Sequence, residues 1–150
     1  MRIVIQRVSQ AKVEVEGNVI GNIGCGLLVL VGVENEDTEE DCRWLAAKTA
    51  GLRIFNDEAG VMNLSVTDID GEILAISQFT LTASTRKGNR PSYIRAAKHP
   101  LAISLYELYV AEIGKLVRKP IQTGQFGANM SVSLTNDGPV TIIIDSKLRG

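Results

Sequence analysis

The sequence predicts an α/β fold, in which a mixed sheet system carries two helices on one side. About seven short segments have the alternating or continuous apolar patterns of strands, and two longer segments have helical periodicity. Along the chain the order is strands, helix, strands, helix, strands, without a repeat or a low-complexity linker. A chain of 150 residues can build a sizeable core, so we expect residues 1–150 to form a single domain.

The first third of the chain predicts three strands. Val13 and Val15 alternate with charged residues, which is typical of a half-exposed strand. A turn at residues 16–18 allows residues 19–23 to return as the hairpin partner. Residues 26–33 form an almost continuous apolar run, which predicts a strand covered on both faces. The longest apolar run, residues 23–33, is too short and too rich in glycine to span a membrane.

Two helices follow from capping signals and periodicity. Asp37 or Thr38 can cap the first helix, whose first turn is acidic, and Gly51 is expected to close it. Residues 100–117 predict the second helix. Its inward side chains are expected to be Leu101, Leu105, either Leu108 or Tyr109, and Ile113.

The remaining strands are predicted from shorter patterns. Residues 52–55 precede a turn, and residues 71–81 begin with an apolar run and end with polar side chains. Residues 130–134 alternate apolar and polar side chains. The Asn-Asp-Gly-Pro sequence at residues 136–139 predicts a turn, and residues 140–144 predict a closing strand.

Charge and cysteine content exclude several classes of protein. The net charge is -1 and the sequence pI is about 5.9, so any contact with nucleic acid must be local. Cys25 and Cys42 have no metal-site spacing and are too few for a disulfide-stapled domain, so both are expected to be reduced. Cys42 lies on the apolar face of the first helix, which favours a small buried residue over a reactive thiol. The N-terminal residues do not resemble a signal peptide, so the protein is expected in the cytoplasm, away from membranes.

Histidine chemistry is limited to His99, the only histidine of the chain. A Ser-His-Asp triad would need this residue, and no polar group is organised around it in the sequence. We therefore expect an ordinary surface histidine and no histidine-cysteine zinc site.

Four stretches could carry chemistry, and each has a plain structural alternative. Residues 77–80, Ser-Gln-Phe-Thr, either line a site at a strand end or form cross-strand hydrogen bonds. Residues 136–140 are either a plain turn or a functional loop, and the sequence leaves the isomer of the Gly138–Pro139 bond open. The basic residues 86–90 are either a solvated loop or a phosphate-binding patch. Residues 123–130 contain glycines that let a ligand approach the backbone, without dinucleotide-binding or P-loop spacing.

Together and in this order, these stretches resemble the D-aminoacyl-tRNA deacylase family. The resemblance covers nearly the whole chain. Its most specific part is the pair Ser-Gln-x-Thr at 77–80 and Asn-x-Gly-Pro-Val-Thr at 136–141, about sixty residues apart. The matching segments are residues 1–8, 26–32, 52–55, 77–81, 90–93, 123–128 and 136–141.

The resemblance implies a homodimeric cytosolic hydrolase with active sites at the subunit interface. The family cleaves the ester between a D-amino acid and the 3′-terminal ribose of tRNA, and it also accepts glycyl-tRNA. It needs no metal or cofactor. The implied fold is a three-layer arrangement of packed β-sheets with two main helices on one side, which agrees with the order of elements above.

The family pattern also assigns roles to individual positions. The implied catalytic residues are Ser77, Gln78, Phe79 and Thr80. The implied pocket residues are Phe126, Gly127, Ala128 and Met130. The residues implied in tRNA phosphate contacts are Arg86, Lys87 and Arg90. Gly138 and Pro139 correspond to the family's cis peptide, whose carbonyl groups point into the partner subunit's site and reject L-amino acids, while Arg7 orients this loop.

The catalytic step has two possible forms. Thr80 is the obvious hydroxyl nucleophile, but no histidine or lysine motif lies beside it to activate it. We therefore favour substrate-assisted hydrolysis, in which the ribose 2′-hydroxyl assists water and Thr80 only positions it. Backbone N–H groups near Phe79 and Thr80 are expected to stabilise the oxyanion.

Two positions depart from the family pattern, and three other functions compete. Asn129 stands where aspartate is commoner, and it either contacts the substrate amino group or only caps a loop. Tyr93 in place of phenylalanine is a mild change. The rivals are a noncatalytic binding module, a proofreading domain of a synthetase, for which the chain has no second domain, and a relative with a trans Gly-Pro bond that attacks certain L-aminoacyl-tRNAs. The presence of Arg7 favours the cis type.

Overall fold

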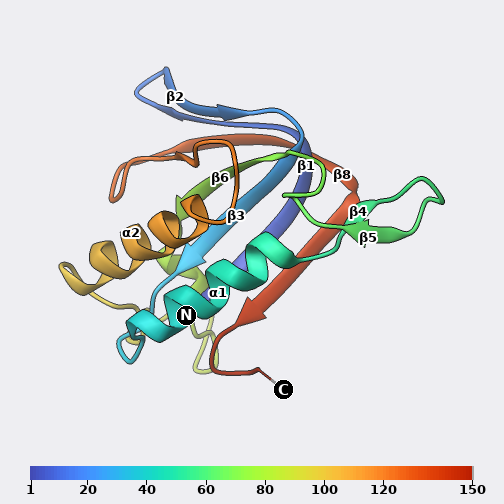
Figure 1. Cartoon of the computed structure of the whole chain (residues 1–150). Coiled ribbons are helices and arrows are strands. Elements are labelled where there is room, and N and C mark those ends of the chain that lie inside the picture. Colours follow the sequence, from blue (N-terminus) through green and yellow to red (C-terminus); the bar gives the residue numbers. More distant parts are fainter. Residues whose placement is uncertain (150) are drawn as a thin grey trace.

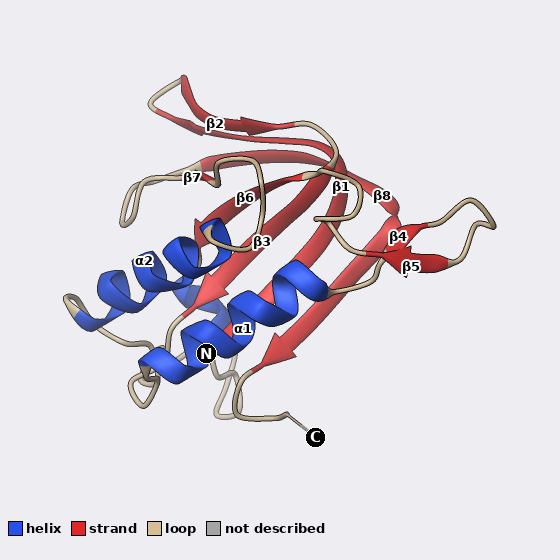
Figure 2. Ribbon diagram, in the orientation of Figure 1, coloured by secondary structure: helices blue, strands red, loops and turns tan. Residues whose placement is uncertain are grey.

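The computed structural model describes residues 1–149, and Figures 1 and 2 show a strongly bent sheet with two helices across one side. The strands are β1 (Arg2–Val15), β2 (Asn18–Ile23), β3 (Gly26–Gly32), β4 (Phe55–Asn56), β5 (Met62–Leu64), β6 (Glu72–Ser77), β7 (Gln122–Thr123) and β8 (Ser131–Asp145). The helices are α1 (Glu39–Gly51), the short 3-10 helix η1 (Phe79–Thr82) and α2 (Leu101–Gly114).

The main sheet is mixed, as the sequence predicts. Its strand order is β2-β1-β3-β6-β7, and β8 pairs with β1. β1 runs antiparallel to β2, β3 and β8, whereas β3, β6 and β7 run parallel to one another. β4 and β5 form a separate two-stranded hairpin at one edge of the molecule (Figure 1).

Two apolar clusters divide the molecule into three layers. One cluster lies between the sheet and the helices and contains Ile3 and Val29 together with buried residues of α1 and α2. The other lies on the opposite face of β3 and β6, where Leu28 and Leu74 pack against Val13 in the far half of β1. Because β1 contributes to both clusters, the long strand passes from the central layer into the outer one. The predicted three-layer arrangement with helices on one side is confirmed.

Helix α1 begins with a capping box at its first turn. The Thr38 backbone N–H donates to Asp41 Oδ2 at 2.8 Å, and the Thr38 side chain caps the helix in return. Asp37 instead accepts a hydrogen bond from the α-amino group of Met1 at 2.5 Å. Gly51 is the last helical residue, followed by Leu52 in an extended conformation. The predicted closure of the helix at Gly51 is therefore close to the observed end.

Helix α2 buries five side chains, three of which the sequence predicts. Leu105, Tyr109 and Ile113 are buried, and the Tyr109 hydroxyl lies 2.7 Å from Thr49 Oγ1 on α1. Leu101 is exposed, so its predicted inward position is wrong; the helix buries the next residue instead.

Cys42 is a buried part of the helix interface, as predicted. Its Sγ donates to the backbone oxygen of Leu105 at 3.2 Å. Burial, reinforced by the nearby Asp37 and Asp41 carboxylates, raises the pKa of the Cys42 thiol to about 12. The thiol is therefore protonated and unreactive at neutral pH. Cys25 is exposed and free.

One predicted boundary is close to the observed one and another is wrong. The strand predicted to end at the polar residues 77–80 ends at Ser77, and the chain continues into η1. Residues 136–139 do not reverse the chain, because β8 continues through them. Val8 pairs with Asn136 and Gln6 pairs with Thr141, so the intervening residues of β8 bulge out opposite one residue of β1. None of the helices within residues 1–149 is long and apolar enough to cross a membrane.

Candidate active site

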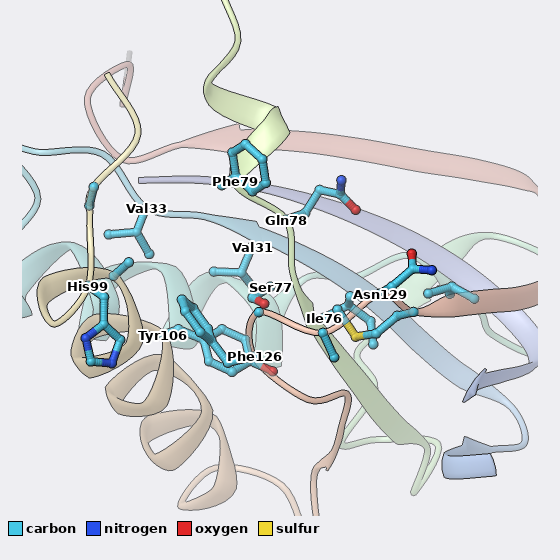
Figure 3. A pocket seen from close by; sticks show the side chains of 16 residues that line it. Val31, Val33, Ile76, Ser77, Gln78, Phe79, His99, Tyr106, Phe126 and Asn129 are labelled. Carbon is cyan, nitrogen blue, oxygen red and sulfur yellow. The ribbon is translucent and has the colours of Figure 1, made fainter. Parts of the chain in front are cut away.

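A cavity of about 420 Å³ opens at the carboxyl end of β6 (Figure 3). Its walls are formed by the end of β6, the residues after it, the loop before β8 and the start of α2. The predicted site residues on these walls are Ser77, Gln78, Phe79, Phe126, Gly127, Ala128 and Met130, and Asn129 lies among them. The cavity therefore joins two stretches that lie about fifty residues apart in the sequence.

The local sequence explains why polar groups reach this position. The apolar run of β6 is buried on both faces and pairs in parallel with β3 as far as Ser77. The Gln78 N–H then donates to the Val31 carbonyl at 2.7 Å, and the chain turns into η1. Ligands commonly bind where parallel strands end, because the chain segments diverge there. Ser77 and Gln78 thus leave the sheet at its most accessible edge.

Thr80 lies beside this edge and is held by its neighbour. Gln78 Nε2 donates to Thr80 Oγ1 at 2.5 Å. Thr80 does not line the cavity, in contrast to Ser77 and Gln78. Within residues 1–149, no imidazole, amine or carboxylate forms a hydrogen bond with its hydroxyl. Among these residues, the Thr80 hydroxyl therefore has a partner that orients it but no basic partner that could accept its proton.

The opposite wall is the loop before β8. Gly127 adopts a φ of +78°, a conformation that glycine accepts without steric cost. The Ala128 N–H donates to the Gln125 carbonyl at 3.1 Å, which closes a turn around this glycine. The Phe126 ring lies 6.0 Å from the Tyr106 ring, centroid to centroid. This turn holds the backbone of Gly127 and Ala128 against the cavity.

Two polar lining residues were not predicted from the sequence. Tyr106 is buried, and its hydroxyl donates to the Ala75 carbonyl at 2.8 Å, so the ring forms a fixed wall. Burial, with a smaller effect of Glu107, raises the pKa of this hydroxyl well above its usual range. His99 is exposed, as expected for a surface histidine, yet it lines the cavity (Figure 3). The one available signal is its position two residues before the start of α2.

The basic stretch forms a closed loop that does not line the cavity. Ser84 and Ser92 exchange two backbone hydrogen bonds of 2.8 Å each, which close the loop at its base. The predicted phosphate-contacting residues Arg86, Lys87 and Arg90 all lie on this loop and are exposed. The loop follows η1 directly, so its base is anchored next to Phe79.

The loop that contains Gly138 and Pro139 lies elsewhere, on the bulge of β8. Arg7, only 7% exposed, spans its base: Nε donates to the Asp137 carbonyl at 2.9 Å and Nη1 donates to the Ile54 carbonyl at 2.7 Å. The Gly138–Pro139 peptide bond is cis. Arg7 thus links the base of this loop to the segment that precedes β4.

Asn136 fixes the same loop from the other side. Its Oδ1 accepts a hydrogen bond from the Val140 N–H at 2.8 Å, and its Nδ2 donates to Gln6 Oε1 at 2.6 Å. Gly138 has a φ of +130°, and a side chain there would approach Arg7 Nη2 to 2.8 Å, so only glycine fits. Neither Gly138 nor Pro139 lines the cavity of its own chain.

Comparison with known proteins identifies the family of this chain. A family model described as D-Tyr-tRNA(Tyr) deacylase matches residues 4–145. The chain belongs to this family. A D-aminoacyl-tRNA deacylase of Flavobacterium johnsoniae is 60% identical over 149 residues, covering 99% of each chain. One of Akkermansia muciniphila is 58% identical over the same length, again with 99% of each chain covered.

Two solved structures are similar to this deacylase family member. A structure titled c-Myc DNA Unwinding Element Binding Protein has a TM-score of 0.92 and 41% sequence identity, covering 97% of this chain and 98% of that one. A probable eukaryotic D-amino acid tRNA deacylase has a TM-score of 0.80 at 16% identity, covering 95% and 97%, which shows a shared fold. The family predicted from the two sequence motifs is confirmed, and with it the enzyme class, a hydrolase that acts on aminoacyl-tRNA.

Proposed function

We propose that this protein hydrolyses the ester between a D-amino acid, or glycine, and the 3′-terminal ribose of tRNA, and leaves L-aminoacyl-tRNA intact. The observation that carries the proposal is the cavity at the end of β6. Among the described residues that line it, none is an aspartate, glutamate, lysine or arginine, so it does not select a charged amino-acid side chain. The Ser77 hydroxyl and the Gln78 amide supply hydrogen-bonding groups at one end of a mainly apolar wall.

The catalytic step requires attack on the ester carbonyl and stabilisation of the oxyanion that forms. The N–H groups of Phe79 and Thr80 open η1, and the first N–H groups of a helix lack acceptors within it. They are the proposed oxyanion donors. Because the Gln78 amide is the one partner of the Thr80 hydroxyl among residues 1–149, this hydroxyl is not activated as a nucleophile. We assign attack to a water molecule assisted by the ribose 2′-hydroxyl, with Thr80 and Gln78 as positioning residues.

The other walls of the cavity bind other parts of the substrate. The turn containing Phe126, Gly127 and Ala128, with Met130 beyond it, holds the terminal adenosine and the amino group of the amino acid. Asn129 lies on the same wall, where it can donate a hydrogen bond but supplies no negative charge for an ammonium group. The exposed residues Arg86, Lys87 and Arg90 contact phosphates of the acceptor end.

Selection against L-amino acids is assigned to the Gly138–Pro139 loop acting in a partner subunit of a homodimer. The loop is exposed, is fixed at its base by Arg7, and does not line the cavity of its own chain. A backbone wedge in this position leaves room for a hydrogen on one side of the substrate Cα and excludes a larger group. Glycine passes such a filter because both its substituents are hydrogens. We place this single-domain enzyme in the cytoplasm.

The test is hydrolysis of D-tyrosyl-, L-tyrosyl- and glycyl-tRNA by the wild-type protein, measured in parallel with a metal chelator present. Release from the D-tyrosyl and glycyl substrates with the L-tyrosyl ester intact is the expected result. Equal hydrolysis of the D and L esters would contradict the proposed filter. Loss of activity in the chelator would contradict the metal-free mechanism.

A nucleic-acid-binding protein without hydrolytic activity is the second candidate. A structure of the same fold, 41% identical to this chain, has a title that names a DNA-binding protein. In the same assay, this candidate predicts bound but intact tRNA with all three amino acids. Hydrolysis of the D ester at a rate proportional to protein concentration would exclude it.

A further inference from the structure

The rim of the cavity carries an exposed aromatic pair. Phe79 is 57% exposed and Tyr93 is 38% exposed, and their ring centroids lie 5.0 Å apart in an edge-to-face arrangement. Ile94, which is 81% exposed, follows directly. Figure 3 shows the Phe79 ring at the edge of the cavity, away from Tyr106 and Phe126 on its inner wall. A contiguous apolar patch bordered by polar residues marks an interaction site more often than single exposed side chains do.

The charge around this pair is strongly one-sided. Residues 79–99 contain five of the 16 basic residues of the chain and none of its 17 acidic ones. Arg95 pairs with Glu34 at 3.9 Å. Within residues 1–149, Arg86, Lys87 and Arg90 form no ion pair. In a protein with a net charge of -1, these basic residues form a local positive surface beside the exposed aromatic rings.

The loop closure places the rings and the cations together. Ser84 and Ser92 exchange two backbone hydrogen bonds at the base of the basic loop, and Tyr93 follows Ser92. Phe79 lies five residues before Ser84, at the start of η1. The aromatic pair therefore sits at the base of the loop, with Phe79 lining the cavity on one side and the cations on the other.

We propose that Phe79 and Tyr93 form a stacking platform for the nucleotide that precedes the terminal adenosine, while the basic loop binds the phosphates of the same strand. Single-stranded nucleic acid presents alternating flat bases and negative phosphates. Binding sites for it combine aromatic side chains with a positive groove. This inference rests on the proposed function, which places the terminal adenosine in the cavity.

A second copy of the chain is the competing occupant of the patch. Pairing of the patch with itself would bring two unpaired positive loops together, which is unfavourable. An RNA strand supplies flat bases that can stack on the exposed rings and negative phosphates that can pair with the basic loop. The charge of residues 79–99 therefore favours RNA.

The direct test is a short single-stranded RNA with 2-aminopurine in the next-to-last position, whose fluorescence is quenched on stacking. The wild-type protein should quench it, and Tyr93→Ala should weaken binding about tenfold, a factor within the range for one stacked base. Tyr93→Phe should retain binding, since it keeps the ring. Leu116→Ala is a matched control, because Leu116 is 47% exposed and follows the far end of α2.

Hydrolysis kinetics test the stacking platform separately from the proposed deacylase activity. For Tyr93→Ala, the ratio of kcat/KM for D-aminoacyl-tRNA to kcat/KM for a D-aminoacyl ester of adenosine should fall about tenfold, because only the tRNA has the preceding base. An unchanged ratio, or no quenching by the wild-type protein, would overturn the platform while leaving the deacylase intact. A change in the oligomeric state of Tyr93→Ala would assign the patch to a second copy. Quenching by a wild-type protein that hydrolyses neither ester would contradict the proposed function alone.

Discussion

The cavity at the end of β6 and the Gly138–Pro139 loop are built in opposite ways. The cavity is open and mainly apolar, and the described residues that line it include no aspartate, glutamate, lysine or arginine, while the nearby Thr80 hydroxyl is held by the Gln78 amide. The loop is exposed at its tip, but its base is held by Arg7 and Asn136 through hydrogen bonds of 2.6 to 2.9 Å. Under the proposed function, the cavity accepts varied amino acids and the rigid loop distinguishes D- from L-amino acids.

Filling the cavity should have the largest effect on activity. We expect Ala128→Trp to lower kcat/KM for D-aminoacyl-tRNA roughly a thousandfold, about 4 kcal/mol of transition-state stabilisation, because the indole occupies the substrate volume. Ala128 lies on a partly exposed loop, so the unfolding free energy should change by less than about 0.5 kcal/mol. Steady-state kinetics and urea unfolding measure the two effects. Ala128→Ser is the control, and full activity of Ala128→Trp would place the substrate elsewhere.

Removing the support of the loop should lower both activity and stability. Arg7→Ala leaves the Ile54 and Asp137 carbonyls without their donors, which should cost about 3 kcal/mol of unfolding free energy. Displacement of the loop by about 1 Å should reduce kcat/KM by roughly a hundredfold. Arg7→Lys should recover only part of the activity, since an ammonium group lacks the rigid fork that spans two acceptors. Wild-type kinetics in Arg7→Ala would show that the loop needs no such support.

Removal of the Thr80 hydroxyl distinguishes a positioning role of this group from a nucleophilic role. If it only orients water, Thr80→Ala should lower kcat about tenfold, the worth of one ordinary hydrogen bond. Loss of a covalent nucleophile would lower kcat by roughly a millionfold, as in enzymes with an acylated serine. Single-turnover hydrolysis of D-tyrosyl-tRNA measures the difference. Thr80→Ser retains the hydroxyl and serves as the control.

A change distant from both regions should affect stability alone. Burial opposes ionisation of Asp41, but hydrogen bonds from Ser146, Thr38 and Lys147 together hold the pKa of its carboxyl below its ordinary value of 3.8. The ionised carboxylate therefore stabilises the fold above that pH, and the contribution is lost as the pH falls below it.

Asp41→Asn should accordingly lower the unfolding free energy at pH 7 by about 1 kcal/mol, the usual worth of a helix cap. It should also flatten the decline in stability below about pH 4, where the unfolded chain takes up a proton at this carboxyl while the folded chain keeps it ionised. Urea unfolding across this range is the measurement. An equally steep decline in the variant would assign the acid sensitivity to another group, and kcat at pH 7 should match that of the wild-type protein.

Local patterns in the sequence predicted the features that depend on neighbouring residues. The capping signals at Thr38 placed the start of α1, and the apolar run before Ser77 placed the strand end that forms the cavity. The turn predicted at residues 136–139 was wrong because its outcome depends on β1, which pairs with β8 on both sides of the bulge. The turn-forming residues are present, but a strand distant in sequence keeps the chain direction.

The parts of the site that the sequence did not reveal are brought in by tertiary packing. Tyr106 lies in α2 and His99 lies two residues before it, and they reach the cavity because α2 crosses the end of β6. The Ile54 carbonyl that accepts from Arg7 likewise lies 47 residues away along the chain. Such contacts depend on how the layers stack, which residue periodicity does not encode.

The central claim is that the loop of one subunit completes the cavity of the other. A heterodimer of Arg7→Ala and Ala128→Trp, isolated with two different affinity tags, tests it directly. If the loop acts in the partner, the intact cavity of one chain meets the intact loop of the other, and the heterodimer should recover about half the wild-type rate from one of its two symmetric sites. If the loop serves its own chain, neither cavity is complete, and a rate no higher than that of the two parent variants would contradict the claim.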